Sequence, residues 1–195
     1  EMAPDFFEAA DLVLRDLPSE ILDEIDPTNN KTGLHYAVEE GQTQVVEYLL
    51  KKGARVDARD KLLRTPLHVA CLKGHSVIAY TLIEFNCDTF ERDISGRTPM
   101  HFAVCCGDVA ASLSLITVLS KNSVDLVHMT DHSGRTPLHY AVFTEGSKQV
   151  KVVEMLISLG ANVNAADTER RTALHTAAEE GKASLIPILI QNGAS

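Results

Sequence analysis

The six residues Thr65-Pro66-Leu67-His68-Val69-Ala70 decide the fold of this chain, because the same phrase returns four more times. Each copy follows Thr-x-Leu-His-x-Ala, with Met100 in place of the leucine once, and successive threonines are 33, 33, 38 and 36 residues apart. Self-similarity at a spacing of roughly 20 to 50 residues indicates an architecture of stacked repeats. The copies begin at Thr32, Thr65, Thr98, Thr136 and Thr172.

Each copy predicts a pair of short helices. Threonine caps the free amides of a helix start, and a proline at the next position, as at Pro66, has its backbone angle preset. A glycine such as Gly74 ends this first helix, and the apolar run after it predicts a second one. Helices of this length are not stable alone, so neighbouring pairs must stack. An aspartate, for example Asp93, opens the turn that links one unit to the next.

Five phrases in phase resemble the ankyrin-repeat family over residues 28–195. The resemblance implies an all-α solenoid of helix–turn–helix units, with hairpin-like fingers that project from the inner row of helices. It also implies that the histidine of each phrase forms hydrogen bonds with backbone groups in and between repeats. The repeats that we expect are about 28–60, 61–93, 94–131, 132–167 and 168–195.

Departures from the pattern lead to two further expectations. Leu63 and Arg170 stand where the third and fourth fingers have a turn glycine. Because neither residue type favours the left-handed backbone region, we expect altered turns in fingers two and five. Repeat three has extra length within 111–129 and repeat four around 144–148. These insertions are either tolerated drift or loops with a function.

Residues 1–27 lack the repeat and contain most of the negative charge. Nine acidic side chains and one arginine give residues 1–26 a net charge of −8, out of −9 for the whole chain. Phe6, Ala10, Val13 and Leu17 have the spacing of one helix face. We expect residues 1–27 to form an acidic helical cap on the first repeat. The alternative is an acidic helix that binds a partner.

Composition excludes several classes of function. A nearly neutral repeat region and an acidic N-terminal segment make nucleic acid or an anionic membrane an improbable partner. No run of eighteen apolar residues and no secretory signal are present. Four cysteines without a CxxC pair indicate reduced thiols in the cytoplasm or nucleus. We find no nucleophile, phosphate-loop or metal-ligand motif, and therefore expect no enzyme activity, cofactor or metal.

The sequence therefore favours a non-enzymatic module, expected to be monomeric, that binds another protein or a peptide. Such a module would belong to a larger scaffold or regulatory protein, with further repeats or another domain after Ser195. An alternative is the regulatory domain of a multidomain enzyme of the kinase or acyltransferase type.

The family resemblance implies that the inner-helix ends and the fingers face the partner. In this chain those positions are apolar in the middle of the stack and acidic at its ends, the pattern of an apolar interface centre with a polar rim. One basic residue precedes each phrase threonine, where it either supports the stack by pairing with the turn aspartates or steers acidic ligand groups. The partner-binding residues that we predict are Leu62, Leu63, Arg64, Leu72, Lys73, Phe90, Ile94, Arg97, Cys105, Cys106, Arg135 and Phe143.

One modification site is also implied by the resemblance. Ankyrin repeats resemble targets of asparagine hydroxylation in which a leucine lies eight residues before the asparagine. Leu156 and Asn164 have this spacing. The alternative is that Asn164 serves only the turn in which it stands.

Overall fold

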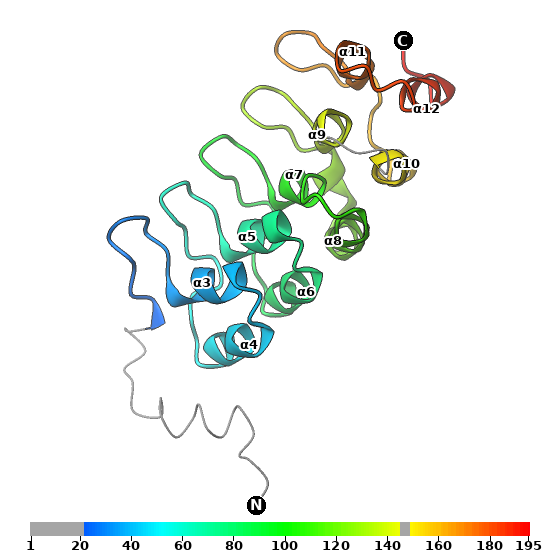
Figure 1. Cartoon of the computed structure of the whole chain (residues 1–195). Helices are drawn as coiled ribbons and strands as arrows, with labels where there is room; N and C mark the ends of the chain where they lie inside the picture. Colours follow the sequence, from blue (N-terminus) through cyan, green and yellow to red (C-terminus); the bar gives the residue numbers. More distant parts are fainter. Residues whose placement is uncertain (1–21, 145–148) are drawn as a thin grey trace, which may run out of the picture.

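The structure, a computed structural model, describes residues 22–144 and 149–195, which form a curved stack of helix pairs (Figure 1). Among these residues there is no strand, so the expected all-α class is confirmed. The inner helices are α3 (Gly33–Glu39), α5 (Pro66–Lys73), α7 (Pro99–Ala103), α9 (Pro137–Phe143) and α11 (Ala173–Glu179). The outer helices are α4 (Thr43–Lys51), α6 (Ser76–Glu84), α8 (Val109–Asn122), α10 (Gln149–Ser158) and α12 (Ile186–Gln191), and a 3-10 helix, η1 (Val124–His128), follows α8.

The phrase starts every inner helix as the sequence predicts. Its threonine occupies the cap position in extended conformation, at Thr65 before α5 for example. The backbone N–H of Thr65 donates to Nδ1 of His68 over 3.1 Å, which satisfies one of the amides left free at a helix start. Gly74 ends α5 in the left-handed region, with φ of 79°. Local sequence therefore fixes both ends of this helix.

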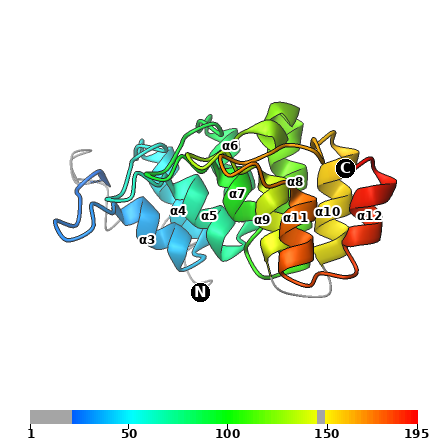
Figure 2. The same ribbon diagram turned by 90° about the horizontal axis from the view of Figure 1, so that it is seen from above.

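Stacking supplies the core. Helix α5 packs against α3, α6 and α7, so each pair contacts the pair before and after it. The helices lie side by side from α3 and α4 at one end to α11 and α12 at the other (Figure 2). Leu67, Leu82 and Leu138 belong to one buried apolar cluster that runs along the stack. Because no pair buries its apolar face alone, stability comes from the contacts between repeats.

Backbone hydrogen bonds join each finger to the next. The N–H of Ile94 donates to the carbonyl oxygen of Leu62 over 2.9 Å, and the N–H of Thr168 donates to that of Ser133 over 2.9 Å. Equivalent bonds join Lys61 to Asn29 and His132 to Ser95. The fingers thus form a continuous row on one side of the helices (Figure 1).

The expectation of altered turns in fingers two and five is wrong. Leu63 has φ of 59° and Arg170 has φ of 61°, so both adopt the left-handed region in which Gly96 and Gly134 stand. The N–H of Leu63 donates to the carbonyl of Asp60 over 2.9 Å, as the N–H of Gly96 does to Asp93. In both fingers the turn aspartate also accepts from two backbone N–H groups of the turn, and these bonds hold the strained left-handed backbone in place.

Replacing Leu63 with asparagine should stabilise the fold by about 0.5–1 kcal/mol, because a left-handed backbone costs an ordinary residue about 1–2 kcal/mol and costs asparagine less. Asn30 already adopts φ of 58° in the first finger. Urea denaturation measures the change. Leu62→Asn is the matched control, because Leu62 is similarly exposed but has no positive φ, and it should give no gain. A loss of stability in Leu63→Asn would contradict the strain argument.

The insertion in repeat three lies where the sequence places it. Helix α8 has 14 residues whereas α6 has nine, and η1 follows it. Leu126 and Val127 of η1 are buried, so the added segment packs onto the stack. In repeat four, most of the predicted insertion around 144–148 lies outside the described residues.

The predicted acidic cap also lies mainly outside the described residues, which begin at Leu22. Its last part differs from the expectation. No helix is described between Asp23 and Thr32, and Ile25 instead forms an antiparallel bridge with Thr32. The first finger therefore begins before residue 28, because pairing across the turn at Asp26 competes with a helix there.

Candidate functional site

The exposed apolar side chains of the predicted site lie on the fingers and at the end of one inner helix. Phe143, the last residue of α9, is 63% exposed, and Ile94 in the third finger is 56% exposed. Leu62, Leu63 and Phe90 are exposed large apolar residues of the second finger and the approach to the third. The bond from Ile94 to Leu62 places two of these residues on adjacent fingers. Apolar side chains left in water in this way mark candidate interaction surfaces.

Three other predicted residues expose less apolar surface than the sequence predicts. Leu72 at the end of α5 is half-buried, and so are Cys105 and Cys106 after α7. All three pack against the buried core cluster. Lys73 is exposed, with its Nζ 3.3 Å from a carboxylate oxygen of Glu39. The middle of the inner face is therefore less apolar than the sequence predicts.

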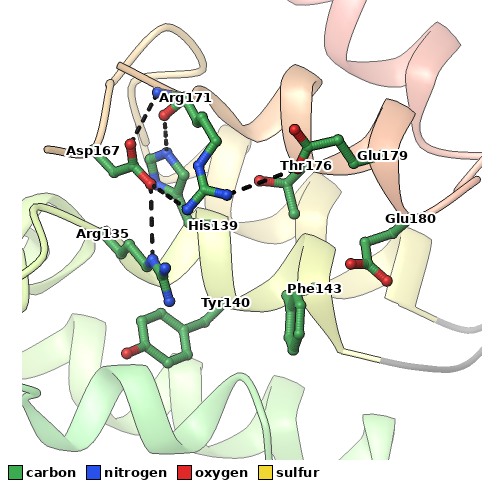
Figure 3. Close-up of a pocket in the computed structure, with 9 residues that line it drawn as sticks. All are labelled: Arg135, His139, Tyr140, Phe143, Asp167, Arg171, Thr176, Glu179 and Glu180. Atoms are coloured by element: carbon green, nitrogen blue, oxygen red, sulfur yellow. Dashed lines mark hydrogen bonds and ion pairs between the residues drawn. The ribbon is translucent and has the colours of Figure 1, made fainter. Parts of the chain in front are cut away.

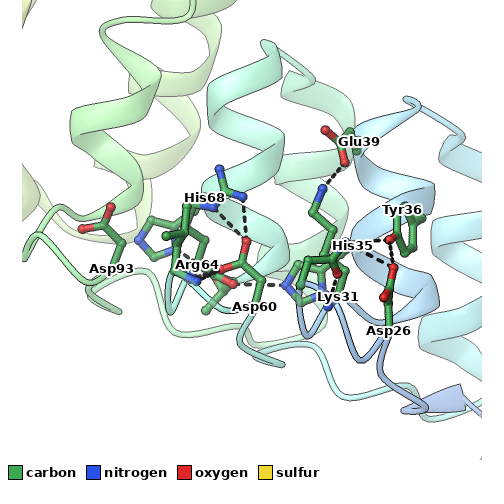
Figure 4. Close-up of polar contacts among 12 residues, drawn as sticks. Asp26, Lys31, His35, Tyr36, Glu39, Asp60, Arg64, His68 and Asp93 are labelled. Atoms are coloured by element: carbon green, nitrogen blue, oxygen red, sulfur yellow. Dashed lines mark hydrogen bonds and ion pairs between the residues drawn. The ribbon is translucent and has the colours of Figure 1, made fainter.

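The basic residues Arg64 and Arg97 are held by the aspartates of their own fingers. Arg64 donates from Nε to Asp60 over 2.8 Å, and its Nη2 lies 2.7 Å from the same carboxylate oxygen (Figure 4). Arg97 binds Asp93 in the same way, at 2.9 Å and 2.7 Å. Burial raises the pKa of Asp60, but the bonds from Arg64 outweigh it and hold that pKa below its ordinary value. These two arginines support the stack, as one of the two interpretations of the basic row predicts.

In repeats one and four a tyrosine hydroxyl, in place of an arginine, donates to the aspartate of the finger. The Tyr36 hydroxyl donates to Asp26 over 2.5 Å, and the Tyr140 hydroxyl donates to Asp131 over 2.7 Å. Bonds from Thr28 and Tyr36 lower the pKa of Asp26 to about 2, and burial together with Asp131 raises the pKa of Tyr140. The basic side chains of these two repeats, Lys31 and Arg135, pair with carboxylates other than those of Asp26 and Asp131. We call these two residues the displaced cations.

The two displaced cations have different surroundings. Lys31 forms an ion pair and a hydrogen bond with Glu39 on α3 (Figure 4). The side chain of Arg135 pairs with the aspartate of the following repeat, with Nε 3.8 Å from Oδ2 of Asp167. The side chain of Arg135 is 42% exposed. Each of the other described basic residues that precede the phrase threonines has at least one ion-pair contact shorter than this one.

Arg135 borders a pocket of about 180 Å³ between repeats four and five (Figure 3). The rings of Tyr140 and Phe143 lie beside it on α9, and α11 supplies the opposite wall. Nε of Arg171, in the finger before α11, is buried and has no hydrogen-bond partner. The lining residues are Arg135, His139, Tyr140, Phe143, Asp167, Arg171, Thr176, Glu179 and Glu180.

The phrase histidines connect the repeats, as the family resemblance implies. His68 and His101 each lie with Nε2 3.1 Å from a carbonyl oxygen of the next repeat, that of Arg97 and Arg135 respectively. Because Nδ1 accepts from the threonine N–H, Nε2 carries the proton and donates to the carbonyl. Burial lowers the pKa of both imidazoles to about 4, so they are neutral at pH 7. His35 and His139 make the same bonds, whereas His175 is exposed and bonds only to Thr172.

Sequence reasoning missed several residues of these surfaces. Tyr140 was not predicted as a site residue, although tyrosine after the phrase histidine occurs only in repeats one and four. The outer face also exposes large apolar residues, Val77 at 63% and Tyr80 at 51%, both on α6. Their i, i+3 spacing was a visible signal for an exposed helix face.

The described residues show no constellation for metal chemistry, since no group of three or more histidine, cysteine or acidic side chains could hold an ion. All four cysteines are free thiols, with Cys71 and Cys87 buried. Burial raises the pKa of Cys87 to about 12, so its thiol is unreactive at pH 7. No helix in residues 22–144 and 149–195 is long and apolar enough to cross a bilayer.

Asn164, the predicted hydroxylation site, is exposed and forms contacts with the last repeat. Its amide nitrogen donates to the carbonyl of Gly193 over 2.8 Å, and its amide oxygen accepts from the N–H of Ser195 over 3.0 Å. The structure thus gives Asn164 a role in joining repeats, and hydroxylation stays a prediction.

Comparison with known proteins agrees with this architecture. The family model for ankyrin repeats (3 copies) matches residues 34–124, 81–167 and 109–195. The chain therefore belongs to the ankyrin-repeat family. Domains of this family are typically non-catalytic modules for interaction between proteins. The overlapping matches do not set the number of repeats, and the described residues contain five inner–outer helix pairs. No curated protein matches the chain.

Proposed function

We propose that this chain is a protein-interaction module, in a scaffold or regulatory role, that binds a partner protein or peptide across its fingers and inner helices. The observation that carries the proposal is the group of large apolar side chains exposed on that face, among them Leu62, Ile94 and Phe143. Exposed aromatic and aliphatic anchors surrounded by charged residues are the usual centre of a protein interface.

The half-burial of Leu72, Cys105 and Cys106 narrows the proposed site. Anchors are expected from the second and third fingers, at Leu62, Phe90 and Ile94, and from Phe143 at the end of α9. The half-buried residues would form the floor between these anchors. Arg64 and Arg97 are already paired with buried aspartates, so we assign them to the support of the surface.

Cross-linking can test which face binds. We would place the photoreactive residue p-benzoylphenylalanine at position 143 in one sample and at position 80 in another, and identify the cross-linked proteins by mass spectrometry. Tyr80 is the matched control, because it is a half-exposed aromatic on the outer helix α6. A partner captured from position 143 but not from position 80 is the expected result. The reverse pattern would place the site on the outer face.

Phe143→Glu should then lower the affinity for that partner at least about tenfold, because an aromatic anchor contributes more than about 1 kcal/mol and the glutamate is strongly hydrated. The variant should keep its thermal midpoint, because Phe143 is largely exposed. Fluorescence anisotropy and thermal denaturation measure the two quantities. Unchanged affinity, with binding lost in Tyr80→Glu instead, would contradict the proposed face.

A further inference from the structure

The ion pairing of Arg135 differs from that of the equivalent basic residues because of two other positions in its own repeat. The residue after the phrase histidine is Tyr140, whose hydroxyl occupies Oδ2 of Asp131. The residue four after the histidine is Phe143, where repeat one has Glu39. In repeat one, tyrosine displaces the cation and Glu39 binds it. In repeat four the displacement occurs, but Phe143 cannot form an ion pair.

The remaining carboxylate near Arg135 already has other donors. Oδ1 of Asp167 accepts from the backbone N–H of Glu169 and of Arg171, both over 2.9 Å. Its Oδ2 lies 3.4 Å from Nη2 of Arg171, closer than the 3.8 Å from Nε of Arg135. Arg135 therefore has donor capacity that the described residues do not use.

A second arginine, Arg171, lines the pocket but is largely paired. Its Nη2 lies 3.4 Å from Asp167 and 3.1 Å from Glu169, and its Nη1 lies 3.9 Å from Glu179, whereas its Nε is buried without a hydrogen-bond partner. Arg135 and Arg171 line the same pocket from consecutive repeats (Figure 3). Arg135 is thus the loosely paired cation of the pocket, and the exposed ring of Phe143 supplies an apolar surface beside it.

We propose that this pocket binds the carboxylate of an aspartate or glutamate in the partner, with an adjacent large apolar side chain of the partner packed on Phe143. The inference rests on the proposed function and names the chemistry of one anchor. Arginine recognises carboxylates through paired hydrogen bonds, which makes Arg135 the main contact. Glu179 at the end of α11 and Glu180 after it also line the pocket, and Glu179 lies 3.9 Å from Nη1 of Arg171, so we expect the ligand carboxylate on the side of Arg135.

A random peptide library tests this chemistry without a known partner. We would select phage-displayed twelve-residue peptides on the full chain and measure the affinity of a synthetic selected peptide by fluorescence anisotropy. Selected sequences should have aspartate or glutamate next to a large apolar residue. Arg135→Gln should weaken binding at least about tenfold, as expected for loss of a charge-assisted contact.

Tyr140→Phe gives a sharper test, because the hydroxyl of Tyr140 donates to Asp131 and we expect no contact between this hydroxyl and the ligand. Removal of the hydroxyl frees Oδ2 of Asp131, and Arg135 can then pair with its own finger as Arg64 and Arg97 do. We expect several-fold weaker binding in Tyr140→Phe. Tyr36→Phe is the matched control, because Tyr36 makes the same bond in repeat one. Its affinity should not change, and thermal denaturation verifies that each variant is folded.

Several outcomes would overturn the inference. Selection of basic peptides, or equal affinity for the original chain and for Arg135→Gln, would exclude Arg135 as the anchor. An unchanged affinity in Tyr140→Phe would show that the tyrosine–aspartate bond does not place Arg135. Peptides that lose affinity in Phe143→Glu but not in Arg135→Gln would overturn this inference and leave the proposed function standing. Peptides whose affinity changes in neither variant would contradict both this inference and the proposed function.

Discussion

Acidification from pH 7.5 to 5.5 should lower the free energy of unfolding by about 3 kcal/mol, from His68 and His101 alone. Burial holds the pKa of each imidazole at about 4 in the folded chain, against an ordinary value of 6.5. Between these two values the unfolded chain binds a proton at each site and the folded chain does not. Stability is therefore complete above pH 6.5 and is lost as the pH falls toward 4.

The magnitude follows from proton linkage. Each histidine that is protonated only in the unfolded chain lowers the unfolding free energy by about 1.4 kcal/mol per pH unit. Burial also lowers the pKa of His35 and of His139, so both add to the same slope. The pKa of Asp167 is below its ordinary value, but a carboxylate lowered in this way loses its contribution only at more acidic pH.

Urea denaturation at pH 7.5, 6.5, 5.5 and 4.5 measures this dependence. His101→Gln should flatten the curve, because the amide can bridge Thr98 and Arg135 without titrating. His128→Gln is the matched control for the substitution itself, since His128 is exposed on η1. A free energy of unfolding that stays constant from pH 7.5 to 4.5 would exclude neutral, buried histidines.

Much of the fold could be predicted from the repeated phrase, because its information is local. Threonine, proline and histidine at fixed spacing define a helix start without reference to other repeats. The length between phrases was equally informative, and it placed the insertion of repeat three in the segment where α8 and η1 lie. The turns of fingers two and five were predicted wrongly, because the prediction considered only the residue type at the left-handed position. Leu63 and Arg170 keep that conformation because Asp60 and Asp167 each accept from two backbone N–H groups of the turn, and backbone bonds between fingers add to this.

The candidate site was less predictable, because it depends on which partner each charged group selects. The basic row was visible in the sequence, but two equivalent arginines form different ion pairs: Arg97 with Asp93 of its own finger and Arg135 with Asp167 of the next. A hydroxyl on Tyr140 decides between them, since it reaches an aspartate nine residues earlier. The half-burial of Leu72 likewise comes from its packing against the core cluster, and a pattern of residue types does not report that packing.

Leu138→Ala should have the second large effect, a loss of about 2–5 kcal/mol in the free energy of unfolding. Leu138 is 1% exposed on α9, where it belongs to the apolar cluster that joins the repeats. Truncation removes the transfer free energy of the buried methyl groups and leaves a cavity, because a stack held from both sides closes only partly. Threonine and histidine of the phrase stay in place, so the helix start is preserved and the loss reports packing.

Chemical denaturation of Leu138→Ala measures the loss, with Leu62→Ala as the matched control. Leu62 is 44% exposed, so the same truncation there should cost less than about 1 kcal/mol. The comparison separates core packing from any general effect of leucine removal. A repeat stack transmits the loss through the contacts that α9 makes with α7 and α11, so weakening its packing destabilises the repeats on both sides. Equal losses in the two variants would show that Leu138 does not pack between repeats.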